Sequence, residues 1–189
     1  AMHKSLGNGV DPADIIGIGL DCTASTVLPV LADGTPLCTL PEFADEPNAY
    51  VKLWKHHAAW QEGEDINTLG VQRGEKWVDQ NGGRISCEGV FPKVLETLRR
   101  APHIYNAASR FIEAGDWLTL ILTGNEVHSA SFAGFKAFWS EKNGYPSNDF
   151  LVELDPRLDN VVGTKISTKI GKMSSSAGRI NENGARLTG

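Results

Sequence analysis

The run IIGIGL at residues 15–20 places the first constraint on the fold. It is apolar, largely β-branched and interrupted by glycines, and it ends at Asp21. A run of this kind is typical of a buried strand, with Gly where another backbone comes close. Because a buried strand needs a sheet around it, we expect one here. A dinucleotide loop is disfavoured because the third Gly of G-x-G-x-x-G is missing and a hairpin pattern follows.

The residues after this run predict a hairpin and a third strand. TVLPV at 26–30 and PLCTL at 36–40 flank the turn signal ADGT, as in a β-hairpin. Pro29 indicates that one of these strands lies at an edge. YVKLW at 50–54 alternates in the manner of a strand.

Helical spacing dominates the middle of the chain. One helix is expected in HHAAWQEGEDINTLG, and a second is expected to open at Ser86, after the break at Gly82 and Gly83, with Pro92 in an early turn. We then expect a short helix in APHIYNAA, a strand in RFIEA, a helix in GDWLTLILTG closed by Gly124, and a short helix around Asp149–Leu154. The other residues from 125 onward are expected to be loop-rich. Strands alternating with helices predict the α/β class with a mixed sheet.

Composition restricts the class of partner and compartment. A net charge of -5 without clustered Lys and Arg argues against nucleic acid. Three widely spaced cysteines, Cys22, Cys38 and Cys87, suit a reducing cytoplasm better than a disulfide framework or a zinc ribbon. No apolar run approaches the ~18 residues that span a bilayer. Since Ala1 precedes the early Met, residues 1–10 are interpreted as a tail or cloning scar.

The stretch WKHH at 54–57 is the densest group of potential chemistry in the chain. His56 and His57 are adjacent, so their side chains diverge on either a strand or a helix. Zinc ligands on one element are normally spaced i, i+4. We therefore expect one packed and one exposed histidine and no metal site. Glu113 and Asp116 are expected to favour a helix start by electrostatics alone.

KMSSS at 172–176 resembles the KMSKS loop of class I aminoacyl-tRNA synthetases. The HIGH-like motif that this loop works with is absent from the sequence. A solvated loop is therefore the expected structure.

Five longer words carry a stronger resemblance. They are GIGLDCTASTVLPVLADGTPLC, VKLWKHHAA, FIEAGDWLTLILTG, SASFAGFKAFW and GYPSNDFLVELDPRL, in this order. Together they resemble the L-ribulokinase branch of the FGGY carbohydrate kinases over residues 11–189. The resemblance implies part of the N-terminal, sugar-binding domain of a ribonuclease H-like, actin-like ATPase fold, with a mixed sheet and inserted helices.

The resemblance also implies an activity and a set of contacts. A full-length kinase of this family transfers the γ-phosphoryl group of MgATP to L-ribulose, giving L-ribulose 5-phosphate in arabinose catabolism. Ala24 and Lys136 fall at ribulose-contact positions of the family, and Trp54 falls where an aromatic lies beside the sugar. The structural alternatives are a core aromatic for Trp54 and a solvated loop charge for Lys136.

The departures from the family pattern set further expectations. The glycine-rich phosphate loop is not found before Asp11, and the segment with the catalytic Asp and the ATP-binding domain are not found by Gly189. We therefore expect no catalytic base, metal or bound nucleotide in this chain, and no kinase activity from it alone. Gly89 stands where the family usually carries Trp, so the resemblance does not predict which residue forms the pocket wall at this position.

Three alternatives stay open at this point. The full-length protein could be a kinase for another pentulose or polyol, such as xylulose or glycerol. It could instead be a non-catalytic sugar-binding module. An exposed sheet edge would also favour a homodimer, since unpaired strand edges invite pairing between chains.

Overall fold

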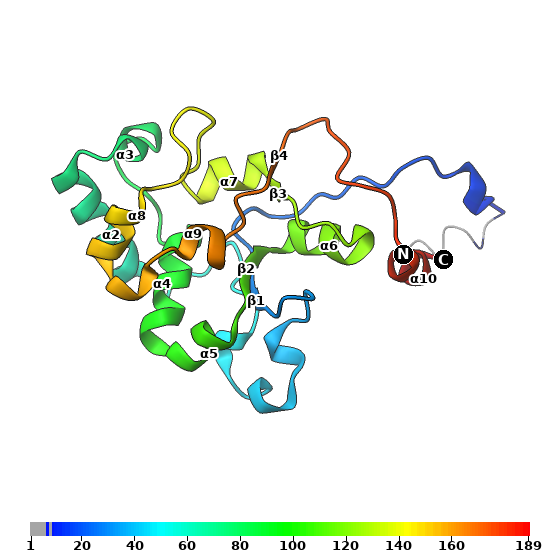
Figure 1. Ribbon diagram of the computed structural model, residues 1–189, viewed down its shortest axis with the longest axis horizontal. Helices are drawn as coiled ribbons and strands as arrows, with labels where there is room; N and C mark the ends of the chain where they lie inside the picture. Colours follow the sequence, from blue (N-terminus) through cyan, green and yellow to red (C-terminus); the bar gives the residue numbers. More distant parts are fainter. Residues whose placement is uncertain (1–6, 8) are drawn as a thin grey trace.

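The computed structural model describes residue 7 and residues 9–189. Residues 1–6 and 8, and with them most of the expected tail at 1–10, lie outside the described residues. In Figure 1, helices gather in a body on the left, and α10 lies on an arm that projects to the right. The extended residues before Cys22 run along the same arm.

The described chain contains short strands and helices of four to fourteen residues, joined by long connecting segments. The strands are β1 (Val27–Val30), β2 (Arg110–Glu113), β3 (His128–Ser129) and β4 (Ile170–Gly171). The helices are α2 (Trp60–Arg73), α3 (Lys76–Gln80), α4 (Val90–Arg100), α5 (Pro102–Ala107), α6 (Ala114–Thr123), α7 (Ala130–Lys136), α8 (Asn148–Leu154), the short α9 (Val161–Thr164) and α10 (Glu182–Thr188). Single 3-10 turns lie at Pro12–Asp14, Leu37–Thr39, Pro41–Phe43, Pro47–Ala49 and Pro156–Leu158.

The described strands form two small sheets. β1 and β2 are antiparallel, with Val27 opposite Glu113. β3 and β4 are parallel, with His128 opposite Ile170. The expected combination of helices and strands is confirmed, although the parallel and antiparallel pairs lie in separate sheets rather than in one mixed sheet.

The prediction of a buried strand at residues 15–20 is wrong for this structure. The segment is extended but forms no strand, and Ile15, Ile16, Ile18 and Leu20 are exposed. No described strand pairs with it, and a Cβ added at Gly17 or Gly19 would meet nothing within 4 Å. The apolar pattern indicates that the segment favours burial, but no sheet among the described residues covers it.

The predicted hairpin is half confirmed. Gly34 makes the turn with φ of 86°, and the Leu31 amide donates to the Thr35 carbonyl at 2.9 Å. The second arm is not a strand, because only an isolated bridge joins Val30 to Pro36 before the 3-10 turn at Leu37–Thr39. Pro36 has no N–H to continue a ladder, and β1 pairs with β2 instead. Similarly, YVKLW contributes one bridge, Lys52 to Val27.

Most predicted helices in the middle of the chain are confirmed, with shifted ends. α4 begins at Val90, after Gly89 as N-cap, rather than at Ser86. α2, α5, α6, α8 and strand β2 lie where the patterns predict them. The region that was expected to be loop-rich contains five further elements, β3, α7, α9, β4 and α10, so that expectation is wrong for these five.

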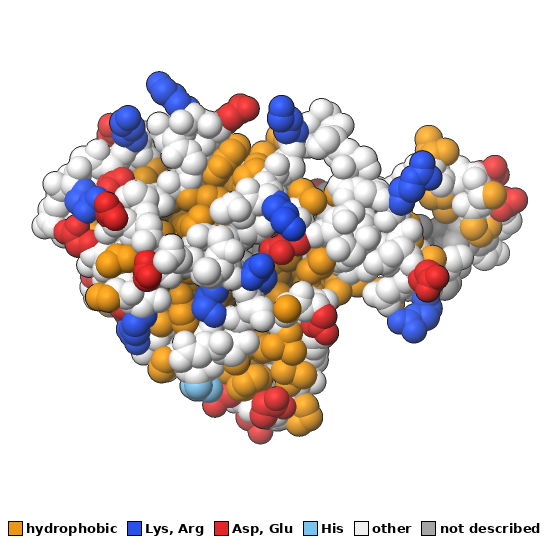
Figure 2. All heavy atoms as spheres, in the orientation of Figure 1, with side chains coloured by type: hydrophobic (Ala, Val, Ile, Leu, Met, Phe, Trp, Pro, Cys, Tyr) orange, Lys and Arg blue, Asp and Glu red, His pale blue; other side chains and the backbone are white. Residues whose placement is uncertain are grey.

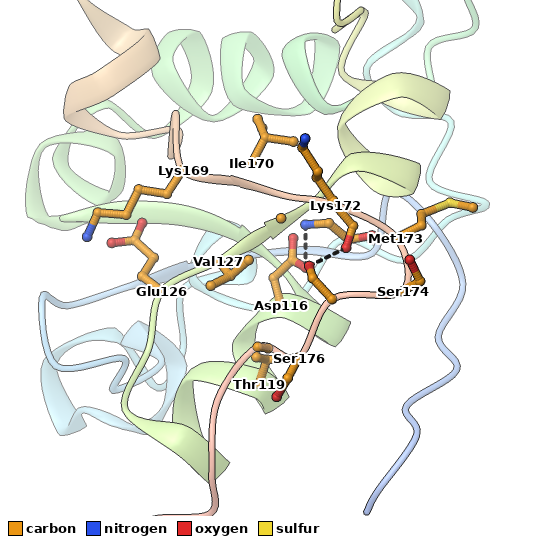
Figure 3. Close-up of a pocket in the computed structure, with 14 residues that line it drawn as sticks. Asp116, Thr119, Glu126, Val127, Lys169, Ile170, Lys172, Met173, Ser174 and Ser176 are labelled. Atoms are coloured by element: carbon orange, nitrogen blue, oxygen red, sulfur yellow. Dashed lines mark hydrogen bonds between the residues drawn. The ribbon is translucent and has the colours of Figure 1, made fainter.

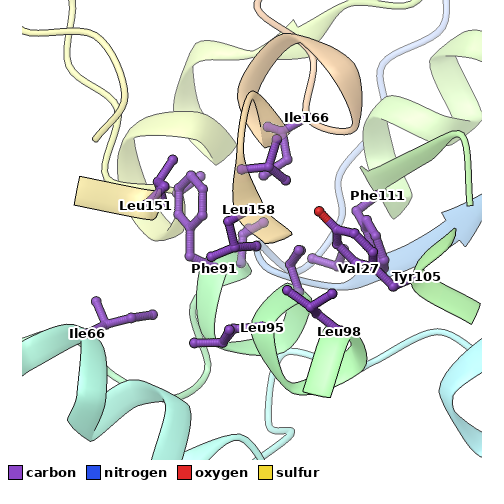
Figure 4. Packing of buried hydrophobic residues seen from close by; sticks show 14 of the residues in the cluster. Val27, Ile66, Phe91, Leu95, Leu98, Tyr105, Phe111, Leu151, Leu158 and Ile166 are labelled. Atoms are coloured by element: carbon purple, nitrogen blue, oxygen red, sulfur yellow. The ribbon is translucent and has the colours of Figure 1, made fainter. Parts of the chain in front are cut away.

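The hydrophobic core is built around α4, which packs against residues of β1, β2, α2 and α8 (Figure 4). Five apolar residues that recur at helical spacing along α4 are buried: Val90, Phe91, Val94, Leu95 and Leu98. They pack with Val27 of β1, Ile66 of α2, Phe111 of β2 and Leu151 of α8. Lys93, Glu96 and Thr97 of the same helix are also buried, which the apolar pattern did not predict. None of the described helices is long and apolar enough to cross a membrane.

Candidate functional site

Ala24 and Ser25 form a turn that leads into β1. Ser25 has a φ of 63°, a region that residues other than Gly seldom adopt. Its hydroxyl donates to the carbonyl oxygen of Glu88. Its own carbonyl oxygen accepts from the ammonium of Lys93. These contacts hold the turn in its unusual conformation and join it to the loop of Glu88. Ala24, in the same turn, is partly buried.

Lys93 joins this turn to the segment that carries Trp54. The lysine lies on α4, is 1% exposed, and donates to the carbonyl oxygen of Leu53 at 2.9 Å as well as to Ser25. Burial lowers the pKa of Lys93 to about 8, although the nearby Glu113 carboxylate works in the opposite direction. One buried ammonium therefore fixes two loops that are far apart in the sequence.

Trp54 projects from the second of these loops. It is 48% exposed, so the alternative that it is a core aromatic is wrong. An exposed indole face beside a fixed backbone can pack against the carbon atoms of a ligand. The exposed part of this side chain is therefore not used to fill the core.

Lys136 ends α7 and makes an ion pair with Glu88. Its Nζ lies 3.1 Å from Oε2 of Glu88 and 5.2 Å from the ring centre of Phe135. The other oxygen of Glu88 lies 2.9 Å from Nε2 of His57. Hydrogen bonds from His57 and then from Lys136 hold the pKa of Glu88 below its usual value. The alternative that Lys136 is a freely solvated loop charge is therefore wrong.

The three predicted sugar contacts are thus attached to one small group of residues. Ser25 connects Ala24 to Glu88, Lys93 connects Ser25 to Leu53 beside Trp54, and Glu88 holds Lys136. We call Ser25, Glu88 and Lys93 the anchoring group. The sequence reasoning did not identify any of its three members.

Gly89 packs directly against this site. A Cβ added at Gly89 would lie 3.1 Å from the carbonyl oxygen of Lys136 and 3.3 Å from that of Ser86. Contacts this short require the backbone to move, so the glycine permits the close approach of the Glu88 loop to the end of α7.

The two histidines of WKHH do diverge, as predicted. The side chain of His57 is 69% exposed and turns to Glu88. Nε2 of His56 lies 2.6 Å from Oε2 of Glu96. The same oxygen accepts from Lys52, and Oε1 of Glu96 accepts from Arg100. Burial would raise the pKa of Glu96, but the bonds from Lys52 and His56 outweigh burial and lower it. His56 is therefore part of a structural ion network.

A second polar cluster lies at the start of α6, where only helix electrostatics was expected. Glu113 is 2% exposed, and neither of its carboxylate oxygens makes a well-formed hydrogen bond among the described residues. Burial raises its pKa to about 8 and raises the pKa of Asp116 to about 7. The expectation that Glu113 and Asp116 act by helix electrostatics alone is therefore incomplete, because burial is the largest influence on the pKa of both carboxyl groups.

Asp116 is held by the backbone of the next strand. Its Oδ1 accepts from the Ser129 amide at 3.0 Å, and its Oδ2 lies 3.5 Å from Nε2 of His128. Burial lowers the pKa of His128 to about 4, so the ring is neutral at pH 7.

Asp116 also borders a cavity of about 450 Å³ (Figure 3). Lys169, Lys172 and the serines of KMSSS lie along its rim. All five KMSSS residues are exposed, as expected of a solvated loop, and Ala177 after them is partly buried. Ala24, Trp54 and Lys136 do not line this cavity. Among the described residues, no group of three or more His, Cys, Asp or Glu could hold a metal ion.

Comparison with known proteins gives a consistent family. No family model matches the chain. A ribulokinase from Mycolicibacterium smegmatis is 46% identical over 190 residues, which cover 100% of this chain and 34% of the relative. A ribulokinase from Bacillus licheniformis is 45% identical over 95% of this chain and 32% of its own length.

The chain is similar to ribulokinases over its whole length. The resemblance found in the five sequence words is thereby confirmed. A third ribulokinase, from Geobacillus thermodenitrificans, is 43% identical over 96% of this chain and 32% of its own length. The ribulokinase-like chain thus spans about a third of the length of the curated relatives it matches.

A solved structure supports the fold of this ribulokinase-like segment. A xyloylose kinase from Brucella ovis superposes with a TM-score of 0.70 at 16% identity, over 96% of this chain and 34% of the other. At that identity the likeness concerns the fold alone. The helices and strands in Figure 1 therefore follow an arrangement that is also present in that structure.

Proposed function

We propose that this chain is the sugar-binding part of a kinase that transfers the γ-phosphoryl group of MgATP to the terminal hydroxyl of L-ribulose. The observation that carries the proposal is the attachment of Ala24, Trp54 and Lys136 to one anchoring group. The ribulokinase names of the relatives supply the sugar, and the product would be L-ribulose 5-phosphate, made in the cytoplasm for arabinose catabolism. We also propose that the segment belongs to a ribonuclease H-like, actin-like ATPase fold.

Each of the three residues has a distinct role in this proposal. Ala24 is small, so the backbone of its turn can approach the sugar closely. Lys136 has three N–H donors, and its bond to Glu88 leaves others for sugar oxygens. Trp54 offers an exposed apolar face to the carbon atoms of the sugar. Together they would hold an uncharged polyol by hydrogen bonds and by one apolar contact.

Phosphoryl transfer depends chiefly on positioning and on charge stabilisation. The segment would contribute the positioning of the acceptor hydroxyl. The nucleotide, its Mg²⁺ and the residue that accepts the hydroxyl proton are proposed to belong to other parts of a ribulokinase-length chain. MgATP supplies the phosphoryl group, and the residues described here fix the sugar that receives it.

The test is ATP-dependent phosphorylation by a ribulokinase-length chain that carries this segment. The panel contains L-ribulose, xylulose and glycerol, with ADP release as the readout. We expect the highest kcat/KM for L-ribulose. A higher kcat/KM for xylulose or glycerol would assign the enzyme to another substrate. Binding of L-ribulose without any ADP release would favour a non-catalytic sugar-binding module.

A further inference from the structure

Glu88 is placed to organise the site without touching the sugar itself. Its two carboxylate oxygens are used separately, Oε1 by His57 at 2.9 Å and Oε2 by Lys136 at 3.1 Å. Its side chain is 20% exposed, so these contacts are only partly screened by solvent. Its main-chain carbonyl holds Ser25 independently of the side chain.

The ionised carboxylate of Glu88 determines which ring nitrogen of His57 carries a proton. The bonds from His57 and Lys136 lower the pKa of Glu88, so at neutral pH the carboxylate only accepts hydrogen bonds. The atom of His57 that faces it must therefore be a donor, which places the proton on Nε2. In the neutral ring Nδ1 is then an acceptor. No hydrogen bond to Nδ1 of His57 is formed by the described residues.

Lys136 and His57 consequently present opposite hydrogen-bonding characters. Lys136 offers N–H donors, whereas His57 with its single proton on Nε2 offers Nδ1 as an acceptor, and one carboxylate contacts both side chains. A sugar hydroxyl can donate and accept at once, so neighbouring hydroxyls match such a pair. The exposure of His57, whose side chain is 69% exposed, leaves it open to a ligand.

We infer that Glu88 is a positioning residue for polyol recognition. It orients the Lys136 ammonium as donor and holds His57 as an additional sugar-binding residue, which accepts a hydrogen bond from a sugar hydroxyl through Nδ1. This inference rests on the proposed function, since it concerns the same sugar. It adds two residues that the family resemblance did not assign.

The test uses steady-state kinetics of a ribulokinase-length chain with L-ribulose. Glu88→Gln keeps the size of the side chain and its main-chain contact but removes the charge, and we expect KM for L-ribulose to rise about tenfold while kcat changes less than about threefold. His57→Gln keeps a donor for Glu88 but lacks the Nδ1 acceptor, and its KM is expected to rise by about threefold or more. His103→Gln is the matched control, because His103 pairs with Glu46 at 3.3 Å and is expected to leave both constants unchanged.

A double-mutant cycle separates positioning from a general effect on folding. In a Lys136→Met background, Glu88→Gln should have less than half of its effect on log KM, because the ammonium that Glu88 positions is no longer present. Glu88→Asp keeps the charge on a shorter side chain, so its KM for L-ribulose should lie between the values of wild type and Glu88→Gln. This variant replaces Glu88→Gln in the test if Glu88→Gln does not fold.

The outcomes distinguish the inference from the proposed function. If wild type phosphorylates L-ribulose but Glu88→Gln and Glu88→Asp leave KM unchanged, the positioning role is overturned and the proposed function stands. Full additivity in the cycle also overturns it. If wild type phosphorylates no sugar in the panel, the proposed function fails and the inference fails with it.

Discussion

The ammonium of Lys93 lies 2.9 Å from the carbonyl oxygen of Leu53, and the same ammonium donates to the carbonyl of Ser25. This contact joins the loop of Trp54 to the turn of Ala24. Both loops leave the core at β1 or at its bridge to Lys52. The buried lysine therefore determines how two candidate sugar contacts lie relative to each other.

Replacing Lys93 tests this role in folding. Lys93→Met keeps a similar length but leaves the carbonyls of Ser25 and Leu53 without their donor. Unpaired buried carbonyls destabilise a protein, so we expect the free energy of unfolding to fall by roughly 1–3 kcal/mol. Urea denaturation of the chain measures this, with Lys55→Met at an exposed position as the control. Equal stability of the two variants would show that Lys93 does not hold the loops.

Trp54 tests the separation of binding from folding. Because its side chain is 48% exposed, Trp54→Ala is expected to change the free energy of unfolding by less than about 1 kcal/mol. In a ribulokinase-length chain it should nevertheless raise KM for L-ribulose by about tenfold through loss of the apolar contact. Trp60→Ala, at another exposed tryptophan, is the comparison. An unchanged KM and kcat for Trp54→Ala would remove this residue from the site.

Glu113 predicts a pH dependence of stability. Its pKa rises from 4.5 to about 8 on folding, so the folded state binds the proton more tightly than the unfolded state does. The stabilisation from the protonated form is complete below pH 4.5 and is lost as pH rises through 8. Relative to Glu113→Gln, wild type should lose roughly 2–4 kcal/mol between pH 5 and pH 9.

The comparison with Glu113→Gln isolates this carboxyl from the other titrating groups. Asp116, whose pKa is raised to about 7, is retained in both proteins, and the difference then reports Glu113 together with its repulsion from Asp116. Thermal or urea unfolding at a series of pH values measures it. A difference between the two proteins that does not vary with pH would contradict the raised pKa.

The exposed apolar segment at 15–20 keeps the homodimer as a prediction. Ile15, Ile16, Ile18 and Leu20 line a groove with Leu122 and Ile180, and Figure 2 shows apolar side chains on the projecting arm. Exposed apolar surface on an extended segment favours association between chains. Light scattering should show a mass that increases with concentration for wild type and less so for Ile16→Lys. A strictly monomeric mass at high concentration would contradict it.

Local patterns predicted the three longest helices, α2, α4 and α6, and predicted the sheet poorly. The spacing of Val90, Val94 and Leu98 repeats within α4 itself, so one segment contains the whole signal. Strand pairing depends on a distant partner: β1 pairs with β2 rather than with the nearby residues 36–40. The sequence of a single strand does not identify that partner. The same limit explains why residues 15–20 show a strand pattern and yet form no strand here.

The site divides in a similar way. Ala24, Trp54 and Lys136 came from the family resemblance, and the structure attaches all three to the anchoring group. Their supporting residues were missed because these contacts join residues 40 to 68 positions apart. Lys93 carried one usable signal, a charge within the apolar spacing of α4. Glu88 carried none, since a glutamate before a helix is common for electrostatic reasons alone.

The most direct test of the central claim is the KM for L-ribulose of Lys136→Met in a ribulokinase-length chain. If Lys136 donates to the sugar from its position on Glu88, KM should rise by about tenfold to a hundredfold, with KM for ATP unchanged. Lys142→Met, at an exposed lysine of the following loop, should behave as wild type. An unchanged KM and kcat for L-ribulose in Lys136→Met would contradict the account.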